Sequence, residues 1–356
     1  MSKVLLYTDN HWSQYSSIIR RRGEFFSERL ENQIFSINWA EELALNTGCT
    51  KVICLGDFFD KENLNSEELS ALNEVKWSQN LEHYFLVGNH EIGLNNLTYN
   101  SAKVFNMITH CQTISKPEYL PFSNILFIPY DLKSSDKSLK DYFADIDYFK
   151  HNAIPKNLII FSHNDIKGIQ YGKYTSQQGF DLKDIEDNCA LFINGHLHNG
   201  TYLNERKTIL NLGNLTGQNF SENAYQYGHY ACVLDLDTLE LEFYENPYAF
   251  NFYKIDFTNN CTQNQIEDEL RKLKNNSVVT VKINEIDTDF VRNCITKCSN
   301  IRDSRVIIQP TITEGNALKT EDLVKLDHMK QFYDYILNDL GNSQLVIEEL
   351  EAINVN

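Results

Sequence analysis

The stretch FINGHLHNG, residues 192–200, places His196 and His198 at the point where an apolar run gives way to a turn of Asn and Gly. A short apolar run of this kind predicts a buried strand. One polar residue is enough to end a strand, so the pair of histidines needs another reason. Other apolar runs in the chain also end in side chains that can bind metal. These side chains are Asp9 and His11, Asp57 and Asp60, Asn89 and His90, and the single His163.

The same apolar runs indicate the fold class. Runs at 3–9, 51–57 and 83–89 predict strands, and the segment 24–45 carries apolar residues at helical spacing. Strand, helix and strand in this order predict a sheet with helices on its faces. The later runs follow one another closely, which favours antiparallel pairs, so we expect an α/β fold with two sheets packed between helices. These later runs lie at 124–130, 157–163, 190–196, 208–214, 230–237 and 239–245.

The composition changes after residue 256, which divides the predicted domains. Residues 1–256 form the large domain, and residues 257–312 alternate between helix and strand patterns, as a small α/β appendage does. Residues 313–356 hold a linker and two helical patterns. An amphipathic helical pair at the end of a chain most often folds back onto its own domain, and the alternative is that it docks on another protein.

The chain of 356 residues carries a formal net charge of −17, which argues against broad electrostatic attraction to nucleic acid. Binding to DNA therefore depends on a local patch, on bound metal ions or on a partner. The one basic cluster consists of Arg20, Arg21 and Arg22. We regard it either as a candidate contact for DNA or as a solvated loop.

The eight cysteines are scattered and form no C-x-x-C pair, which favours reduced cysteines in the core over disulfides or a zinc site. The apolar run from Val4 to Tyr7 is shorter than the core of a secretory signal. No run reaches the roughly 18 apolar residues of a membrane-spanning helix. We therefore expect a cytoplasmic protein without a membrane segment.

The side chains at the ends of the strands predict a metal centre. In an open α/β sheet, the carboxyl ends of the strands meet at one crevice. Aspartate, asparagine and histidine donors without a thiolate suit a pair of divalent ions such as manganese, iron or zinc. Two ions about 3.5–4 Å apart stabilise both the attacking and the leaving oxygen when a phosphoester is cleaved. The expected donors are Asp9, His11, Asp57, Asn89, His163, His196 and His198.

The order of these motifs, D-x-H, G-D-x-x-D, G-N-H-[DE], a lone His and G-H-x-H, resembles that of the calcineurin-like metallophosphoesterases. Within them the chain is most similar to the SbcD-type DNA nucleases, above all those of T-even phages. The narrower likeness rests on GDFFD at 56–60, on GHLH at 195–198 and on LGNLTGQNFSEN at 212–223. The resemblance implies a four-layer α-β-β-α metallophosphoesterase sandwich with a small α/β cap domain and C-terminal helices.

The resemblance also implies a role for each residue of the motifs. Asp9, His11 and His198 bind one ion, Asn89, His163 and His196 bind the other, and Asp57 bridges the two. His90 lies beside the scissile phosphate as the catalytic residue, where it stabilises charge or protonates the leaving oxygen. Asp60 orients a metal ligand, whereas Glu91 receives no role. Manganese is the expected metal, with magnesium, iron and zinc as alternatives.

The implied activity is that of a metal-dependent exonuclease and endonuclease on the ends of double-stranded DNA, in recombination, repair or replication. The implied partner is an SbcC-like ABC ATPase of the SMC type, bound by the C-terminal helices, and the implied assembly is a homodimer. A phage-encoded protein of this kind works in the host cytoplasm. The acidic charge fits this reading if the ATPase supplies much of the affinity for DNA.

Two other functions remain open at this point. A stand-alone metallophosphatase or cyclic-nucleotide phosphodiesterase has the same metal motifs but does not need C-terminal helices. A non-catalytic scaffold on the same fold is the second alternative, although scaffolds usually lose ligands and here the whole set is present. Cleavage of linear duplex DNA, compared with hydrolysis of small phosphoesters, separates the first alternative from a nuclease.

Overall fold

Two six-stranded sheets form the frame of the molecule in the computed structural model, which describes residues 2–14, 22–134, 137–171, 174–259, 261–284 and 288–309. The first sheet has the order β16–β15–β1–β2–β3–β6. Its strands β1, β2, β3 and β6 run parallel, and β15 pairs antiparallel with β1 and with β16. The strands are β1 (Lys3–Tyr7), β2 (Cys49–Cys54), β3 (Glu82–Leu86), β6 (Cys111–Ile114), β15 (Tyr230–Asp235) and β16 (Leu241–Glu245).

The second sheet has the order β13–β14–β12–β9–β8–β7. Its four central strands run parallel, and the two edge strands β13 and β7 are antiparallel to their neighbours. The parallel strands of both sheets therefore supply the carboxyl ends at which the predicted ligands lie. The strands are β7 (Glu118–Leu120), β8 (Ile125–Ile128), β9 (Ile159–Ser162), β12 (Leu191–Asn194), β13 (Thr201–Tyr202) and β14 (Ile209–Asn211).

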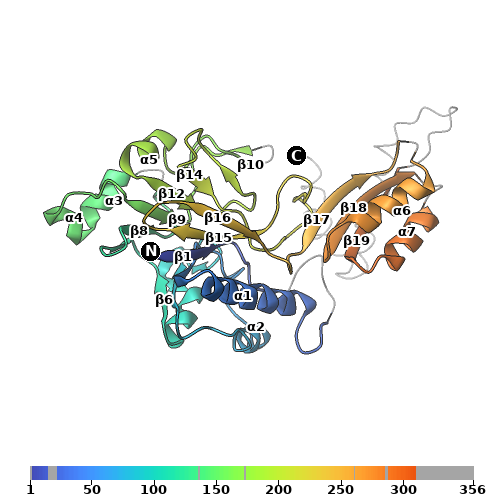
Figure 1. Ribbon diagram of the computed structural model, residues 1–356, viewed down its shortest axis with the longest axis horizontal. Coiled ribbons are helices and arrows are strands. Elements are labelled where there is room, and N and C mark those ends of the chain that lie inside the picture. Colours follow the sequence, from blue (N-terminus) through green and yellow to red (C-terminus); the bar gives the residue numbers. More distant parts are fainter. Residues whose placement is uncertain are drawn as a thin grey trace, which may run out of the picture. The chain divides into compact units, whose positions relative to one another are not determined.

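Strand β1 shows how the layers form. Val4 and Leu6 pack between the two sheets, whereas Leu5 and Tyr7 pack toward the helices on the outer face of the first sheet. Because successive side chains of a strand point to opposite faces, a wholly apolar strand is buried on both sides. The fold is therefore the predicted α-β-β-α sandwich (Figure 1). The first sheet is covered by α1 (Glu28–Asn46), α2 (Ser66–Leu72) and the 3-10 helix η1 (Ser101–Met107), and the second by α3 (Leu139–Asp145), α4 (Asp147–His151) and α5 (Leu182–Asn188).

Local sequence explains where some elements differ from the prediction. The helix expected over 24–45 begins at Glu28, because the Ser27 side chain caps it by accepting a hydrogen bond from the Leu30 N–H. The edge strands β6 and β7 do not stand out in the sequence, because both are short and carry polar residues. Two small hairpins also occur among the described residues. They are β4 (Ile92–Gly93) with β5 (Asn96–Asn100), and β10 (Gln170–Tyr171) with β11 (Tyr174–Thr175).

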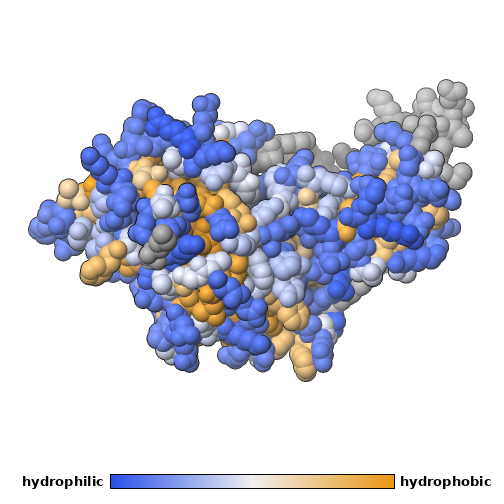
Figure 2. Space-filling view, in the orientation of Figure 1, coloured by the Kyte–Doolittle hydropathy of each residue, from blue (hydrophilic) through white to orange (hydrophobic). Residues whose placement is uncertain are grey.

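A third sheet of three parallel strands forms the small α/β part. It has the order β17–β18–β19, and Val279 and Val281 of β18 pack with Ile266 and Leu270 of α6. The sheet begins at Asn251, before the domain boundary expected at residue 257, because β17 pairs along its length with β18. Figure 2 shows a mainly hydrophilic surface over this part. Its elements are β17 (Asn251–Asp256), α6 (Gln263–Lys272), β18 (Ser277–Asn284), α7 (Thr288–Lys297) and β19 (Ile301–Gln309).

Two sequence predictions can be compared with the described residues, and others lie outside them. All eight cysteines are free, as expected of reduced thiols. None of the described helices has the length and apolar character needed to cross a membrane. The predicted linker and C-terminal helices, residues 313–356, lie outside the described residues, and so do Arg20 and Arg21 of the basic cluster.

Candidate dimetal centre

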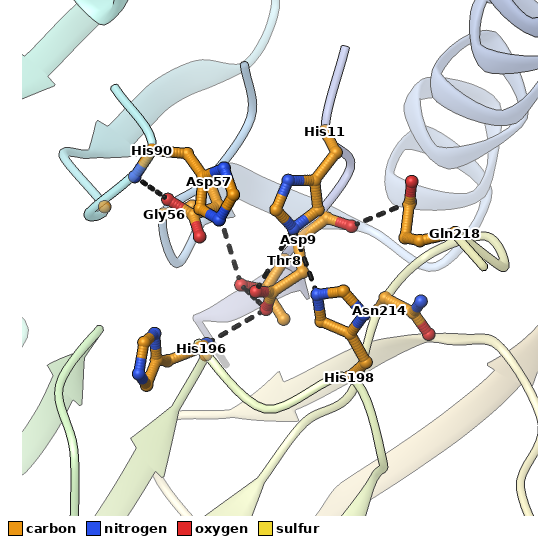
Figure 3. Close-up of polar contacts among 12 residues, drawn as sticks. Thr8, Asp9, His11, Gly56, Asp57, His90, His196, His198, Asn214 and Gln218 are labelled. Carbon is orange, nitrogen blue, oxygen red and sulfur yellow. Dashed lines mark hydrogen bonds and ion pairs between the residues drawn. The ribbon is translucent and has the colours of Figure 1, made fainter. Parts of the chain in front are cut away.

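The predicted ligands meet at the carboxyl ends of the parallel strands. Asp9 and His11 follow β1, Asp57 follows β2, His163 follows β9, and His196 belongs to the turn after β12. Their donor atoms form groups in which every atom lies within 4.8 Å of the others. Figure 3 shows that side chains from both sheets point into this space. The groups are Asp9, His11 and His198; His11, Asp57 and His90; and Asp57, His163 and His196.

Two histidines in the first group have their tautomers set by carboxylates. His11 Nδ1 lies 3.1 Å from Asp60 Oδ1, and His198 Nδ1 lies 3.2 Å from Glu222 Oε1. Because a carboxylate only accepts hydrogen bonds, each Nδ1 carries the proton and each Nε2 presents a lone pair. The two Nε2 atoms are 3.1 Å apart. Two facing lone pairs repel each other unless a cation lies beside them, so this geometry fits a bound metal ion.

The pKa values of the same two histidines are shifted in opposite directions. Burial lowers the pKa of His11, and the nearby His198 lowers it further. Burial also acts to lower the pKa of His198, but the hydrogen bond to Glu222 raises it above its ordinary value. The pair therefore accommodates one positive charge more readily than two.

The second group centres on Asp57. His163 Nδ1 donates to the Leu55 carbonyl over 2.8 Å, which turns its Nε2 toward Asp57 Oδ2, 3.1 Å away. Burial alone would lower the pKa of His163, yet the charge of Asp57 raises it to about 9. Asn89 Oδ1 lies 2.9 Å from His196 Nδ1 in the same part of the site. All four polar side chains expected at the second ion therefore come together.

Two buried atoms of the site lack a hydrogen-bond partner among the described residues. They are Asp9 Oδ1 and His163 Nε2. His163 Nε2 also lies 3.1 Å from Asp57 Oδ2, and the two atoms belong to different donor groups, Asp9 to the first and His163 to the second. Buried polar atoms are almost always paired, because an unpaired one costs about 1–3 kcal/mol. A divalent ion at each donor group would give each atom a partner, and the residues present therefore fit a dimetal site.

The backbone of the site is strained at the ligands themselves. Asp9, His11, Asp57 and His196 have positive φ angles of 50°, 46°, 48° and 77°. This region is unfavourable for residues with a Cβ, and such strain is commonly found at functional sites. Hydrogen bonds between loops hold the strained residues in place: Asp9 N donates to the Gly56 carbonyl and His196 N donates to Asp9 Oδ2, at 3.1 and 3.0 Å.

Glycine at two motif positions lets the loops approach closely. A Cβ on Gly56, whose φ is +113°, would overlap the imidazole of His163. A Cβ on Gly88 would overlap the carboxylate of Asp57. Each glycine therefore admits a ligand into space that any other residue would fill.

His90 lies on the open side of the centre. Its side chain is 43% exposed, whereas that of His11 is 4% exposed. The His90 backbone N–H donates to Asp57 Oδ1 over 3.0 Å, and its Nδ1 lies 3.1 Å from the Asp60 carbonyl oxygen. The ring meets that of His11 edge to face, with centroids 4.6 Å apart. In the group of His11, Asp57 and His90, the imidazole of His90 is therefore the one that solvent reaches readily. A substrate can reach it for the same reason.

Two carboxylates beside the ligands were given no role from the sequence. Glu91 is fully buried and accepts hydrogen bonds from Phe59 N and Gly88 N over 3.1 and 2.7 Å, which joins the loops after β2 and β3. Burial, followed by the charge of Asp57, raises the pKa of Glu91 to about 8. Glu222 orients the imidazole of His198, because its Oε1 lies 3.2 Å from His198 Nδ1.

Arg29 is a third residue without a signal in the sequence. This buried arginine in α1 donates from Nη2 to the His11 carbonyl over 3.1 Å. Burial lowers its pKa to about 10, which leaves it charged at neutral pH. Arg22, the described member of the basic cluster, instead forms an ion pair with Glu67 at the surface. The role of Arg20, Arg21 and Arg22 as DNA contacts remains a prediction.

Residues 2–239 match the calcineurin-like phosphoesterase family. Among solved structures, a dimetal phosphatase from Danio rerio aligns with 65% of this chain and 91% of its own, at 12% sequence identity and a TM-score of 0.38. No curated protein matches the chain.

Proposed function

The chain belongs to the calcineurin-like phosphoesterase family, whose members hydrolyse phosphoesters with two metal ions, and from that premise we propose that it is a metal-dependent DNA nuclease. The substrate is the phosphodiester backbone of double-stranded DNA ends, cut as an exonuclease and an endonuclease. The observation that carries the hydrolytic part of the proposal is the pair of donor groups that share Asp57.

The ligands divide between two positions. Asp9, His11 and His198 would hold one divalent ion. Asn89, His163 and His196 would hold the other, and Asp57 would contact both. When bound, the two ions supply the positive charge that stabilises the attacking and the leaving oxygen. Manganese suits this mixture of oxygen and nitrogen donors, as do magnesium, iron and zinc to differing degrees.

The residues around the ligands supply positioning and proton transfer. Asp60 holds the His11 ring by its Nδ1, and Glu222 does the same for His198. His90, exposed and next to Asp60, donates a hydrogen bond or a proton to the leaving oxygen of the scissile phosphate. An imidazole is suited to this role because its ordinary pKa of about 6.5 lies near neutral pH.

The narrower assignment to DNA rests on two features. The segment that carries Glu222 is similar to that of SbcD-type nucleases, and we assign the three-stranded sheet of residues 251–309 to the small α/β cap that this resemblance implies. The net charge of −17 argues against DNA binding by this chain alone, so the proposal requires a partner that brings affinity for DNA. We propose that this partner is an SbcC-like ATPase bound through residues 313–356, and that the nuclease is a homodimer.

The test is cleavage of an end-labelled linear duplex in Mn²⁺, with and without the ATPase, beside hydrolysis of p-nitrophenyl phosphate as a small monoester. We expect cleavage of the duplex that is lost with EDTA and reduced about 100-fold or more in His90→Ala, within the range that general acids contribute. His151→Ala is the matched control, because His151 is an exposed histidine at the end of α4.

Hydrolysis of the monoester without any cleavage of DNA, even with the ATPase present, would favour a stand-alone phosphatase. Full activity of His90→Ala would contradict the chemistry assigned to His90. A wild-type protein that binds no metal would favour the non-catalytic scaffold.

A further inference from the structure

A cavity of about 340 Å³ lies at the same edge of the sheets as the metal centre. Its lining comes from the ends of β6 and β8, from β5 and from α3 and the loop before it. A volume of this size is typical of pockets for small molecules or parts of them. The lining includes Leu97, Ser115, Tyr130, Asp131, Lys137 and Tyr142.

Tyr130 joins this cavity to the metal centre. Its ring lines the cavity, and the ring centroid lies 6.1 Å from that of His196. Its backbone N–H donates to the Val87 carbonyl over 2.9 Å, which ties the end of β8 to the strand end that leads into Asn89. The side chain is only partly buried, in contrast to the fully buried Tyr142 on the wall. A group attached to a phosphate at the metals would therefore lie next to the Tyr130 side chain.

The charged side chains that line the cavity balance one another. Asp131 Oδ2 accepts hydrogen bonds from Lys137 Nζ and from the Tyr142 hydroxyl, over 2.8 and 2.9 Å. Lys137 Nζ also lies over the Tyr142 ring, 4.9 Å from its centroid. The other charged residues of the lining are Lys116 and Asp145, which are of opposite sign. A balanced lining favours a neutral planar group over a second phosphate.

We propose that this cavity, named here the Tyr130 pocket, binds the nucleoside next to the scissile phosphate, with its base stacked on Tyr130. This inference rests on the proposed phosphodiesterase function and specifies the substrate group beside the metal centre. Aromatic side chains stack on every base, because each base has a flat π-face. The apolar wall from Leu97 and the hydrogen-bonding groups of Ser115 and Lys116 surround such a base.

The experiment compares two diesters that share one leaving group. Thymidine 5′-(p-nitrophenyl phosphate) carries a nucleoside, and methyl p-nitrophenyl phosphate carries only a methyl group. In Mn²⁺, we expect wild-type kcat/KM to be higher for the nucleoside ester by about tenfold, within the range found for one base stacked on an aromatic side chain. Tyr130→Ala and Tyr130→Leu should bring this ratio close to one, mainly through KM, whereas Tyr130→Phe should keep it.

Phe122→Ala is the control, because Phe122 is fully exposed and does not line the Tyr130 pocket; the ratio should stay at the wild-type value. The ratio cancels any general loss of activity in a variant. An equal ratio in wild type, Tyr130→Ala and Tyr130→Leu would overturn the inference while leaving the phosphodiesterase function in place. A metal-loaded wild type that hydrolyses neither diester would instead overturn the proposed function, and the inference with it.

Discussion

At the scale of single residues, the two histidines after β12 have different neighbours. His198 Nε2 faces His11 Nε2, whereas His196 Nδ1 contacts Asn89 Oδ1. In a strand, side chains two residues apart point to the same side. Here His196 also adopts a positive φ of 77°, which bends the chain between the two rings. The two imidazoles therefore reach two different metal positions from one short turn.

Because the two histidines lie at different metal positions, each histidine variant should lose a different ion. His198→Ala should abolish binding of the ion beside Asp9 and His11, and His196→Ala should abolish binding of the other. Adding His11→Ala to His198→Ala should remove no further ion, because residues that hold the same ion are coupled and their effects are not additive. Adding His163→Ala to His198→Ala should instead remove both ions. Calorimetric titration with Mn²⁺ gives the number of sites for each variant. Identical behaviour of the two double variants would refute the division.

Glu222 should affect metal binding through His198, although its Oε1 also accepts hydrogen bonds from Asn214 Nδ2 and Gln218 N over 3.1 and 3.0 Å. Glu222→Gln replaces the carboxylate that accepts the His198 Nδ1 proton, so we expect metal affinity at that position to fall roughly 10–100-fold, as for other partners of metal ligands. Glu205→Gln, an exposed glutamate in the turn before β14, should have no effect. Calorimetric titration with Mn²⁺ measures the metal affinity of both variants. Unchanged affinity in Glu222→Gln would show that the tautomer of His198 is set in another way.

At the scale of elements, the connection from β8 to α3 depends on one aspartate. Asp131 accepts hydrogen bonds from Lys133 N, Lys137 Nζ and the Tyr142 hydroxyl. Burial acts to raise the pKa of Asp131, but the hydrogen bond from Lys137 holds it below its ordinary value. The charged form is thus favoured by folding, and the stabilisation is present above about pH 3.9, the ordinary pKa of the group.

Asp131→Asn should therefore lower the free energy of unfolding at pH 7 by about 1.5–3 kcal/mol, the usual contribution of hydrogen bonds to a charged group. The difference from wild type should shrink as the pH falls below about 3.9 and through the lowered pKa of the folded state, because the carboxylate of the folded wild type becomes protonated only there. Urea unfolding at a series of pH values measures this. Asp145→Asn, at an exposed position in α3, is the control. A difference independent of pH would exclude the charge of Asp131 as its cause.

At the scale of the whole molecule, the metal centre joins the two sheets. Its ligands come from β1, β2 and β3 of one sheet and from β9 and β12 of the other. The carboxylates and imidazoles of these ligands are buried together, and Asp9 Oδ1 and His163 Nε2 have no hydrogen-bond partner among the described residues. Bound ions should therefore stabilise the folded chain as well as the reaction.

We expect Mn²⁺ at 100 times its dissociation constant to stabilise the protein by about 2.7 kcal/mol for each ion that binds only the folded state. Thermal unfolding in Mn²⁺ and in EDTA should then differ by several degrees. Asp57→Asn should lose most of the difference, because Asp57 lies in two of the three donor groups and shares one of them with His11. An equal midpoint for wild type in Mn²⁺ and EDTA would contradict a site formed across the two sheets.

The sequence by itself determined the fold class and the identity of the clustered donors. Apolar runs such as 3–9 predict strands, and parallel strands end at one edge, so Asp9 and His163 were expected together despite their separation. Local pattern was sufficient here, because side-chain period and strand direction are properties of each short segment.

Only the tertiary structure decided which other groups surround the ligands. Arg29 and Glu91 are an ordinary helix residue and a turn residue in the sequence, yet one contacts the His11 carbonyl and the other ties two loops together. Tyr130 ends a predicted strand, and its place beside His196 depends on how the second sheet packs on the first. These contacts arise between distant segments, and their burial and direction follow from packing, which no local pattern encodes.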